Sequence, residues 1–205
     1  MFLREPPEND AARAAYEADR AADGYVTNHT RLWSWRPDLD EAFRRLRLGM
    51  MSSSALTERD FAVLVTATAS QRGDSYCSLA WGRRLAGLTD AETAARVLGG
   101  DSPEGLSPRE AALADWARKV VPDPNATTER DVARLREAGL EDPEIFEATA
   151  FVAFRLAFST VNDALGAAPD EERNVARRRS AYERECSRAR RSSIVSASSG
   201  ALSGR

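Results

Sequence analysis

The sequence holds little sulfur and almost no imidazole, with two cysteines, Cys77 and Cys186, and one histidine, His29, in 205 residues. Two cysteines are too few for the disulfide framework of a small secreted domain. One histidine cannot build a multi-histidine metal site, and no cluster of cysteine and acidic ligands replaces it. We therefore expect no metal site and a reducing, cytoplasmic setting.

Long apolar segments and nucleotide-binding motifs are also missing. The longest apolar run, Ile145 to Val161, is interrupted by Glu147 and Arg155. It is shorter than the ~20 residues that cross a bilayer, so we expect a core helix and no membrane partner. The N-terminus, MFLREPPEND, lacks the apolar region of an export signal. Neither a G-x-S-x-G motif, a P-loop nor a glycine-rich dinucleotide fingerprint is present, and we expect no cofactor.

Charge is abundant but unevenly spread. The net charge is −3, yet the segment from Arg173 to Arg205 holds nine arginines against Glu183 and Glu185, so the rest of the chain is strongly acidic. An acidic body argues against nucleic acid as a partner of the folded part. Residues 170–205 form a basic, serine-rich tail, which is typical of a solvated extension that is helical at first and then disordered.

Helix-forming residues dominate what remains. Alanine, leucine, arginine and glutamate are frequent, and β-branched alternation is scarce. Four pairs place a capping side chain three residues before an acid: Thr57 with Asp60, Thr89 with Glu92, Ser107 with Glu110, and Thr128 with Asp131. Glycines such as Gly73 and Gly87 then close the segments. The pattern predicts an all-α chain with helices near 9–22, 38–50, 57–71, 75–86, 90–98, 108–121, 129–138 and 143–165, and a further amphipathic stretch from Asp170 to Arg191.

The sequence repeats itself after about 50 residues. LTERD at 56–60 leads to AGLTDAE at 86–92, and LSPRE at 106–110 leads to AGLEDPE at 138–144. Two related helical units are implied, and only the first contains a cysteine. We expect residues 1–50 to be an N-terminal helical segment of the same domain and residues 51–169 to be the helical domain itself.

Cys77 lies in the stretch GDSYCSLAWGRRLAGLTDAE, near a predicted helix start. If Asp74 or Ser75 caps this helix, the thiol lies in the first turn, where free amides and the helix dipole favour a thiolate. At about 100° per residue, Asp74, Cys77 and Trp81 share one face. Buried free cysteines are also common and mostly inert, so a core role and a site role are both open.

The same stretch carries a resemblance to a known family. SYCSLAWGRRLAGLTDAE, the upstream LTERD, and the downstream LSPREAALADWARKVV and LREAGLEDPEIFEA resemble the carboxymuconolactone decarboxylase-like family, whose superfamily includes alkyl hydroperoxidase D. ADGYVTNHTRLWSWRPDLDEAF, residues 22–43, is similar to the N-terminal segment of its peroxidase-related branch. The resemblance spans about residues 10–170. It implies an alkyl hydroperoxidase D-like helical bundle built from two related units.

Thiol-active members of that family use a C-x-x-C pair, a histidine four residues after the second cysteine, and an upstream relay glutamate. Here Cys77 matches the second cysteine, while Asp74 stands at the first cysteine position and Trp81 at the histidine position. Asp60 is the acid nearest to the glutamate position. The resemblance thus implies Cys77, Asp74 and Asp60 as catalytic residues, without the resolving cysteine that a dithiol shuttle needs.

Three further side chains are candidates for a pocket around Cys77. Trp81 only donates through its indole, so it either walls a pocket or fills the core. Tyr76 either donates a hydrogen bond to a substrate oxygen or packs. His29 lies in GYVTNHTR, which we predict to be a loop. It is a general base if the fold or a neighbouring subunit brings it near Cys77, and otherwise an exposed or capping residue.

The resemblance implies an oxidoreductase that reduces a small-molecule peroxide through the single thiol of Cys77, with an external thiol as reductant. The alternatives are a catalytically degenerate oligomer that binds a small ligand and a non-thiol decarboxylase or lactone-type enzyme. Members of the family are commonly homo-oligomers, often trimers or hexamers. An apolar group suited to such a subunit contact is formed by Leu32, Trp33, Trp35, Phe43 and Leu46.

Overall fold

The computed structural model describes residues 1–101 and 104–170, which contain nine α-helices, one 3₁₀ turn and no strand. The all-α class expected from the sequence is confirmed. The elements are α1 (Asp10–Asp23), α2 (Asn28–Trp33), α3 (Pro37–Ser52), α4 (Glu58–Arg72), α5 (Ser75–Leu88), α6 (Ala91–Gly99), α7 (Pro108–Val120), η1 (Pro124–Ala126), α8 (Glu129–Glu137) and α9 (Asp142–Ala164). All of them belong to one compact unit, residues 1–168. The predicted tail helix, apart from Asp170, falls outside the described residues.

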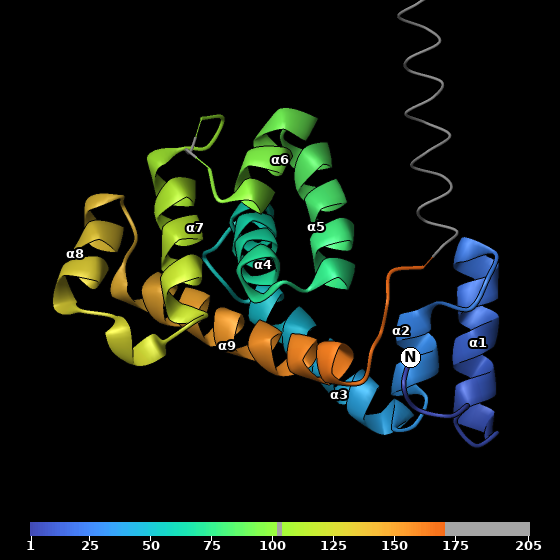
Figure 1. Cartoon of the computed structure of the whole chain (residues 1–205). Helices are drawn as coiled ribbons and strands as arrows, with labels where there is room; N and C mark the ends of the chain where they lie inside the picture. Colours follow the sequence, from blue (N-terminus) through green and yellow to red (C-terminus); the bar gives the residue numbers. More distant parts are fainter. Residues whose placement is uncertain (102–103, 171–205) are drawn as a thin grey trace, which may run out of the picture. The chain divides into compact units, whose positions relative to one another are not determined.

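Helix α4 is the central helix of this compact unit, with α5, α6, α7 and α9 around it (Figure 1). Every residue from Asp60 to Ala69 is buried. The segment DFAVLVTATA carries small and apolar side chains on all sides, so the helix has no polar face to present to water. Phe61 packs against Phe151 of α9, with ring centroids 4.6 Å apart.

A sharp corner joins α4 to α5. Gly73 ends α4 with a φ of 78°, a left-handed conformation that glycine adopts without a steric penalty. The next residue, Asp74, caps α5, and its backbone N–H donates to the carbonyl of Ala69 at 2.9 Å. The corner therefore fixes the first turn of α5, which holds Cys77, against the buried end of α4.

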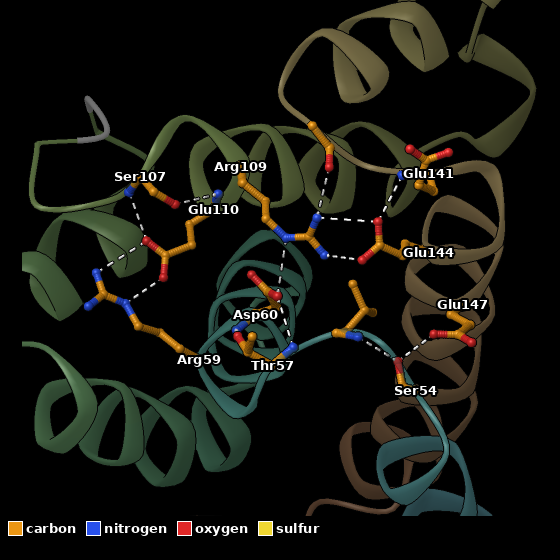
Figure 2. A network of polar contacts seen from close by, with 12 residues as sticks. Ser54, Thr57, Arg59, Asp60, Ser107, Arg109, Glu110, Glu141, Glu144 and Glu147 are labelled. Atoms are coloured by element: carbon orange, nitrogen blue, oxygen red, sulfur yellow. Dashed lines mark hydrogen bonds and ion pairs between the residues drawn. The ribbon is translucent and has the colours of Figure 1, made fainter.

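The two repeated units of the sequence correspond to α4–α6 and α7–α9. Each begins with a capping box, formed by Thr57 and Asp60 in α4 and by Ser107 and Glu110 in α7. The arginine inside each box binds the acid of the other box (Figure 2). Arg59 Nε lies 2.5 Å from Glu110 Oε1, and Arg109 Nε lies 3.4 Å from Asp60 Oδ2.

Arg109 also joins α7 to the start of α9 within the second unit. Its Nη2 donates to Glu144 Oε1 at 2.6 Å, and Glu144 in turn accepts from the backbone N–H of Glu141, the N-cap of α9. Ser54, just before α4, donates to Glu147 of α9 (Figure 2). Glu147, one of the two charged residues in the apolar run, is thus paired.

Several predicted boundaries need correction. Residues 28–33 form the short helix α2 rather than a loop, because Thr27 accepts a hydrogen bond from the backbone of Thr30 and caps it. Asp90, not Thr89, caps α6. Gly87 lies inside α5, which continues to Leu88, so it does not end that helix.

Helix α3 differs from the others because none of its residues is buried. Large apolar side chains on it remain exposed, including Leu39, Leu46 and Leu48. Within residues 1–101 and 104–170, no helix combines the length and the apolarity that a bilayer crossing requires.

Candidate functional site

A partly open cavity of about 230 Å³ lies among α2, α3, α5 and α9. Cys77 contributes to its wall, together with residues from all four helices. The walls are mainly aromatic and basic and consist of His29, Asp40, Phe43, Arg44, Arg47, Tyr76, Cys77, Ala80, Trp81, Phe154, Arg155 and Phe158. The structure therefore gathers Cys77 and the three expected pocket residues, His29, Tyr76 and Trp81, around one space.

The cap of α5 fixes the position of the thiol. Asp74 Oδ1 accepts a hydrogen bond from the backbone N–H of Cys77 at 2.8 Å, which places the cysteine in the first helical turn, as predicted. Asp74 is completely buried, and its second oxygen, Oδ2, accepts no hydrogen bond within the described part of the chain. A carboxylate oxygen without a donor thus lies beside the thiol but is not part of the cavity wall.

Arg155 of α9 contacts the sulfur from the other side. Its Nη2 donates to Cys77 Sγ at 3.0 Å. The guanidinium carbon lies 4.7 Å from the ring centroid of Phe158 and 5.9 Å from that of Trp81. These ring faces favour a nearby cation. A guanidinium next to the sulfur also favours the thiolate over the thiol.

Burial nevertheless dominates the ionisation of Cys77. It raises the pKa of the thiol to about 12, against a smaller lowering by the charge of Arg155. The negative charge of Asp74 raises the pKa further, whereas Ser159 lowers it. The position of Cys77 at a helix start predicted a thiolate, but the buried thiol keeps its proton at neutral pH.

His29 lies in the same cavity, although the sequence placed it in a loop. Its ring packs among Trp33, Tyr76 and Phe158, with centroid distances of 5.9, 6.4 and 5.4 Å. His29 Nε2 is 3.5 Å from Asp40 Oδ1 on α3. The fold of a single chain therefore brings an imidazole and its carboxylate neighbour to the pocket of Cys77, without a second subunit.

Asp60 is not among the residues that line the cavity. Its Oδ2 accepts a hydrogen bond from the backbone N–H of Thr57 at 2.9 Å and pairs with Arg109. Only 2% of Asp60 is exposed. These contacts give it a structural role in the cap of α4 and in the bridge between the two repeated units.

The two arginines Arg155 and Arg47 of the site differ in how clearly the sequence marked them. Arg155 stood out because it interrupts an apolar run, and the structure shows that it lines the cavity. Arg47 lies in the arginine-rich segment RRLRLG, where nothing distinguishes it from Arg44 and Arg45. Its position depends on how α3 crosses α9, which local sequence does not encode. No group of three or more potential metal ligands occurs in residues 1–101 and 104–170.

Comparison with known proteins gives matches among solved structures only. No protein-family model matches the sequence, and a search of curated proteins finds no match either. A peroxidase-related protein of Ralstonia eutropha JMP134, described as an alkylhydroperoxidase AhpD core, superposes with a TM-score of 0.69 at 24% identity. The match covers 84% of this chain and 93% of that one.

Two other solved structures show the same arrangement. A peroxidase-related protein from Silicibacter sp. TM1040 gives a TM-score of 0.72 at 21% identity, with 84% of this chain and 93% of that chain covered. The debrominase Bmp8 gives 0.68 at 13% identity, with coverages of 85% and 96%. With these superpositions and its nine helices in the described residues, the chain has the fold of the alkylhydroperoxidase AhpD core.

Proposed function

We propose that this protein is a single-thiol peroxidase that reduces a small organic hydroperoxide at Cys77. The fold alone does not select this reaction, since its solved examples include peroxidase-related proteins and a debrominase. The observation that carries the proposal is the contact of 3.0 Å between Arg155 Nη2 and Cys77 Sγ in the wall of a cavity.

In the proposed reaction, Cys77 loses its proton and its sulfur attacks the terminal oxygen of the hydroperoxide. The O–O bond breaks, the sulfur becomes a sulfenic acid, and the alkoxide takes up a proton to leave as an alcohol. Two equivalents of an external thiol then release water, restore Cys77 and leave as a disulfide.

Arg155 suits the first step of this reaction. Its charge stabilises the thiolate that must form and the negative charge that develops on the leaving oxygen. Because the resting thiol has its pKa raised to about 12, ionisation is coupled to substrate binding and proton removal rather than completed beforehand. Asp74 Oδ2, buried beside the thiol without a hydrogen-bond donor, is a candidate proton acceptor.

His29 is a candidate for the protonation of the departing alkoxide. It shares the cavity with Cys77, and an imidazole both accepts and donates protons near neutral pH. The reductant has to come from outside the described fold, because Cys77 is the only cysteine there. A supply of external thiol fits a reducing compartment such as the cytoplasm.

The test is hydroperoxide consumption by the purified full chain, with tert-butyl hydroperoxide as substrate and dithiothreitol as reductant. We expect turnover by the original sequence and by Cys186→Ser, and only the buffer rate with Cys77→Ser. Dimedone should label one sulfenic acid per chain, at Cys77, when peroxide is added without reductant. Turnover by Cys77→Ser equal to that of the original sequence would refute the proposal.

A non-thiol acid–base enzyme is the second candidate, because His29 and Asp40 form a close pair in the same cavity. In that case His29, held by Asp40, transfers protons on a substrate that never bonds to sulfur. The two candidates differ in a simple experiment. A reaction that survives Cys77→Ser but is lost in His29→Gln supports the second candidate.

A further inference from the structure

The cavity beside Cys77 has positive charge that no acidic side chain neutralises. Arg47 and Arg155 both line it, and within the described residues neither lies within 4.0 Å of a carboxylate. Arg44 lines it too, but its Nε and Nη2 both donate to the carboxylate of Glu41 at 2.7 Å. The one acid in the wall, Asp40, faces His29. Neither guanidinium therefore forms a close ion pair, although the charge of Asp40 acts on Arg47 from a longer distance.

The lack of a counter-ion is most costly at Arg155. Only 4% of this residue is exposed, and its Nε is buried with no hydrogen-bond partner. A buried charge normally requires a paired charge or a full set of hydrogen bonds. The protonated thiol of Cys77 accepts one N–H but supplies no negative charge.

Arg47 is half-buried on the α3 side of the same cavity. Burial lowers its pKa, the guanidinium groups of Arg155, Arg84 and Arg44 lower it further, and the charge of Asp40 opposes them by a smaller amount. This mutual repulsion means that several positive charges converge here, so an anion that enters the cavity relieves it.

The remaining wall defines the rest of the ligand. Phe43, Phe154 and Phe158 line the cavity with Tyr76 and Trp81, so the space between the two arginines is aromatic. A volume of about 230 Å³ is below the range of roughly 300–1,000 Å³ typical of drug-sized ligands, which favours a small molecule.

We propose that this cavity binds a small aromatic carboxylic acid in its ionised form. The carboxylate group pairs with Arg47, and the ring lies among the aromatic side chains next to Arg155. If the protein is the peroxidase proposed above, its substrate is an acidic organic hydroperoxide. This identification of the substrate rests on the proposed function, whereas the binding of an aromatic carboxylate does not. Binding itself requires no chemistry at the sulfur.

The experiment uses the full chain carrying Cys77→Ser and compares benzoate with benzamide, a neutral molecule of nearly the same shape. Calorimetric titration should give a dissociation constant at least about tenfold lower for benzoate, a difference that shrinks as salt is added. Arg47→Gln should remove most of the preference, and Arg47→Lys should retain part of it. Arg45→Gln is the matched control, because Arg45 lies on the same helix, 71% exposed and outside the cavity.

Equal affinity for the two probes, or binding of neither, would overturn the proposal. So would a benzoate preference that is unchanged in Arg47→Gln or is equally lost in Arg45→Gln. Thermal unfolding of each variant shows whether it is folded, and the salt dependence of benzoate binding to Cys77→Ser alone gives an independent measurement. The thiol is absent from these proteins, so a failure of the peroxidase proposal leaves the result unaffected.

Discussion

At the residue scale, two opposite charges act on one sulfur atom. Arg155 favours the thiolate of Cys77, whereas burial, the largest effect, and the charge of Asp74 both oppose it. The sequence resemblance aligns Asp74 with the first cysteine of a C-x-x-C pair. At this position Asp74 forms no disulfide with Cys77 and places a negative charge beside its thiol.

The two charges should have opposite effects on the reactivity of Cys77. We expect Asp74→Asn to lower the pKa of the thiol and speed its alkylation by iodoacetamide at pH 8.5, because the negative charge is removed while the helix cap is kept. Arg155→Met should raise the pKa and slow the reaction. Rates are measured in a Cys186→Ser background. A change in the same direction for both variants contradicts this electrostatic picture.

The raised pKa of Cys77 also predicts a stability change at alkaline pH. The unfolded thiol ionises near pH 9.0, whereas the folded one ionises near 12. Between these values the unfolded state has lost more protons, so the free energy of unfolding falls as pH rises, by up to about 1.4 kcal/mol per pH unit.

Denaturant unfolding measured at several values between about pH 6 and pH 11 tests this. The original sequence should lose stability faster above pH 9 than Cys77→Ala does, and the two slopes should agree below pH 8. Parallel curves over the whole range would mean that the thiol ionises equally well in the folded and unfolded states.

The sequence supplied only part of the residues at the site. Helical periodicity placed Cys77 and Trp81 on one face, and both line the cavity, whereas Asp74 caps the helix and does not line it. Periodicity could not bring His29 or Arg155 to the thiol, since their approach depends on how α2 and α9 pack against α5. The expectation of a catalytic Asp60 came from family spacing, and the structure instead gives this acid a capping role.

At the element scale, the charged caps of α4 and α7 hold the two repeated units together. We expect Arg109→Gln to lower the free energy of unfolding by about 1–3 kcal/mol, because it leaves the buried carboxylate of Asp60 without its cation. The alkylation rate of Cys77 should stay the same, since this bridge does not line the cavity. Chemical denaturation and alkylation of the folded protein measure the two effects.

Arg136→Gln is the control for this substitution. Arg136 pairs with Asp142 at 2.7 Å, but the side chains are 54% and 69% exposed, so its loss should have no measurable effect. Equal stability of the two variants would show that the buried bridge contributes nothing. A slower alkylation of Cys77 in Arg109→Gln would indicate that Asp60 influences the thiol after all.

Most helices were predictable because their ends carry side-chain chemistry that depends on neighbouring residues. Thr57 with Asp60 and Ser107 with Glu110 marked the starts of α4 and α7 correctly. The start of α6 was offset by one residue, because Asp90 accepts from the backbone N–H groups of Glu92 and Thr93, whereas the hydroxyl of Thr89 donates to the carbonyl of Leu85. Helix α2 was missed because six residues are too few to show a helical period.

At the scale of the whole molecule, association between copies stays a prediction from the sequence. The exposed face of α3 supports it, because Leu39 and Leu46, seven residues apart, share one side and are 40% and 55% exposed. We propose that a second copy covers this face. Light scattering after size-exclusion chromatography should give a multiple of 22.5 kDa.

Leu46→Glu should reduce that mass to the monomer value, because it places a charge in an apolar contact. Phe146→Glu, at a residue of α9 that is 74% exposed, is the matched control and should leave the mass unchanged. A monomeric mass for the original sequence would remove the basis for an α3 interface.

Arg59 of the first repeated unit pairs with the capping acid of the second, and Arg109 of the second pairs with the capping acid of the first. Such reciprocal contacts are typical of an isologous dimer. In this chain, however, both partners are parts of one polypeptide. Their encounter therefore proceeds at an effective concentration set by the connection from α6 to α7, not by the amount of protein in solution. A chain cut at that connection would unfold at a midpoint that rises with protein concentration, as a two-component complex does.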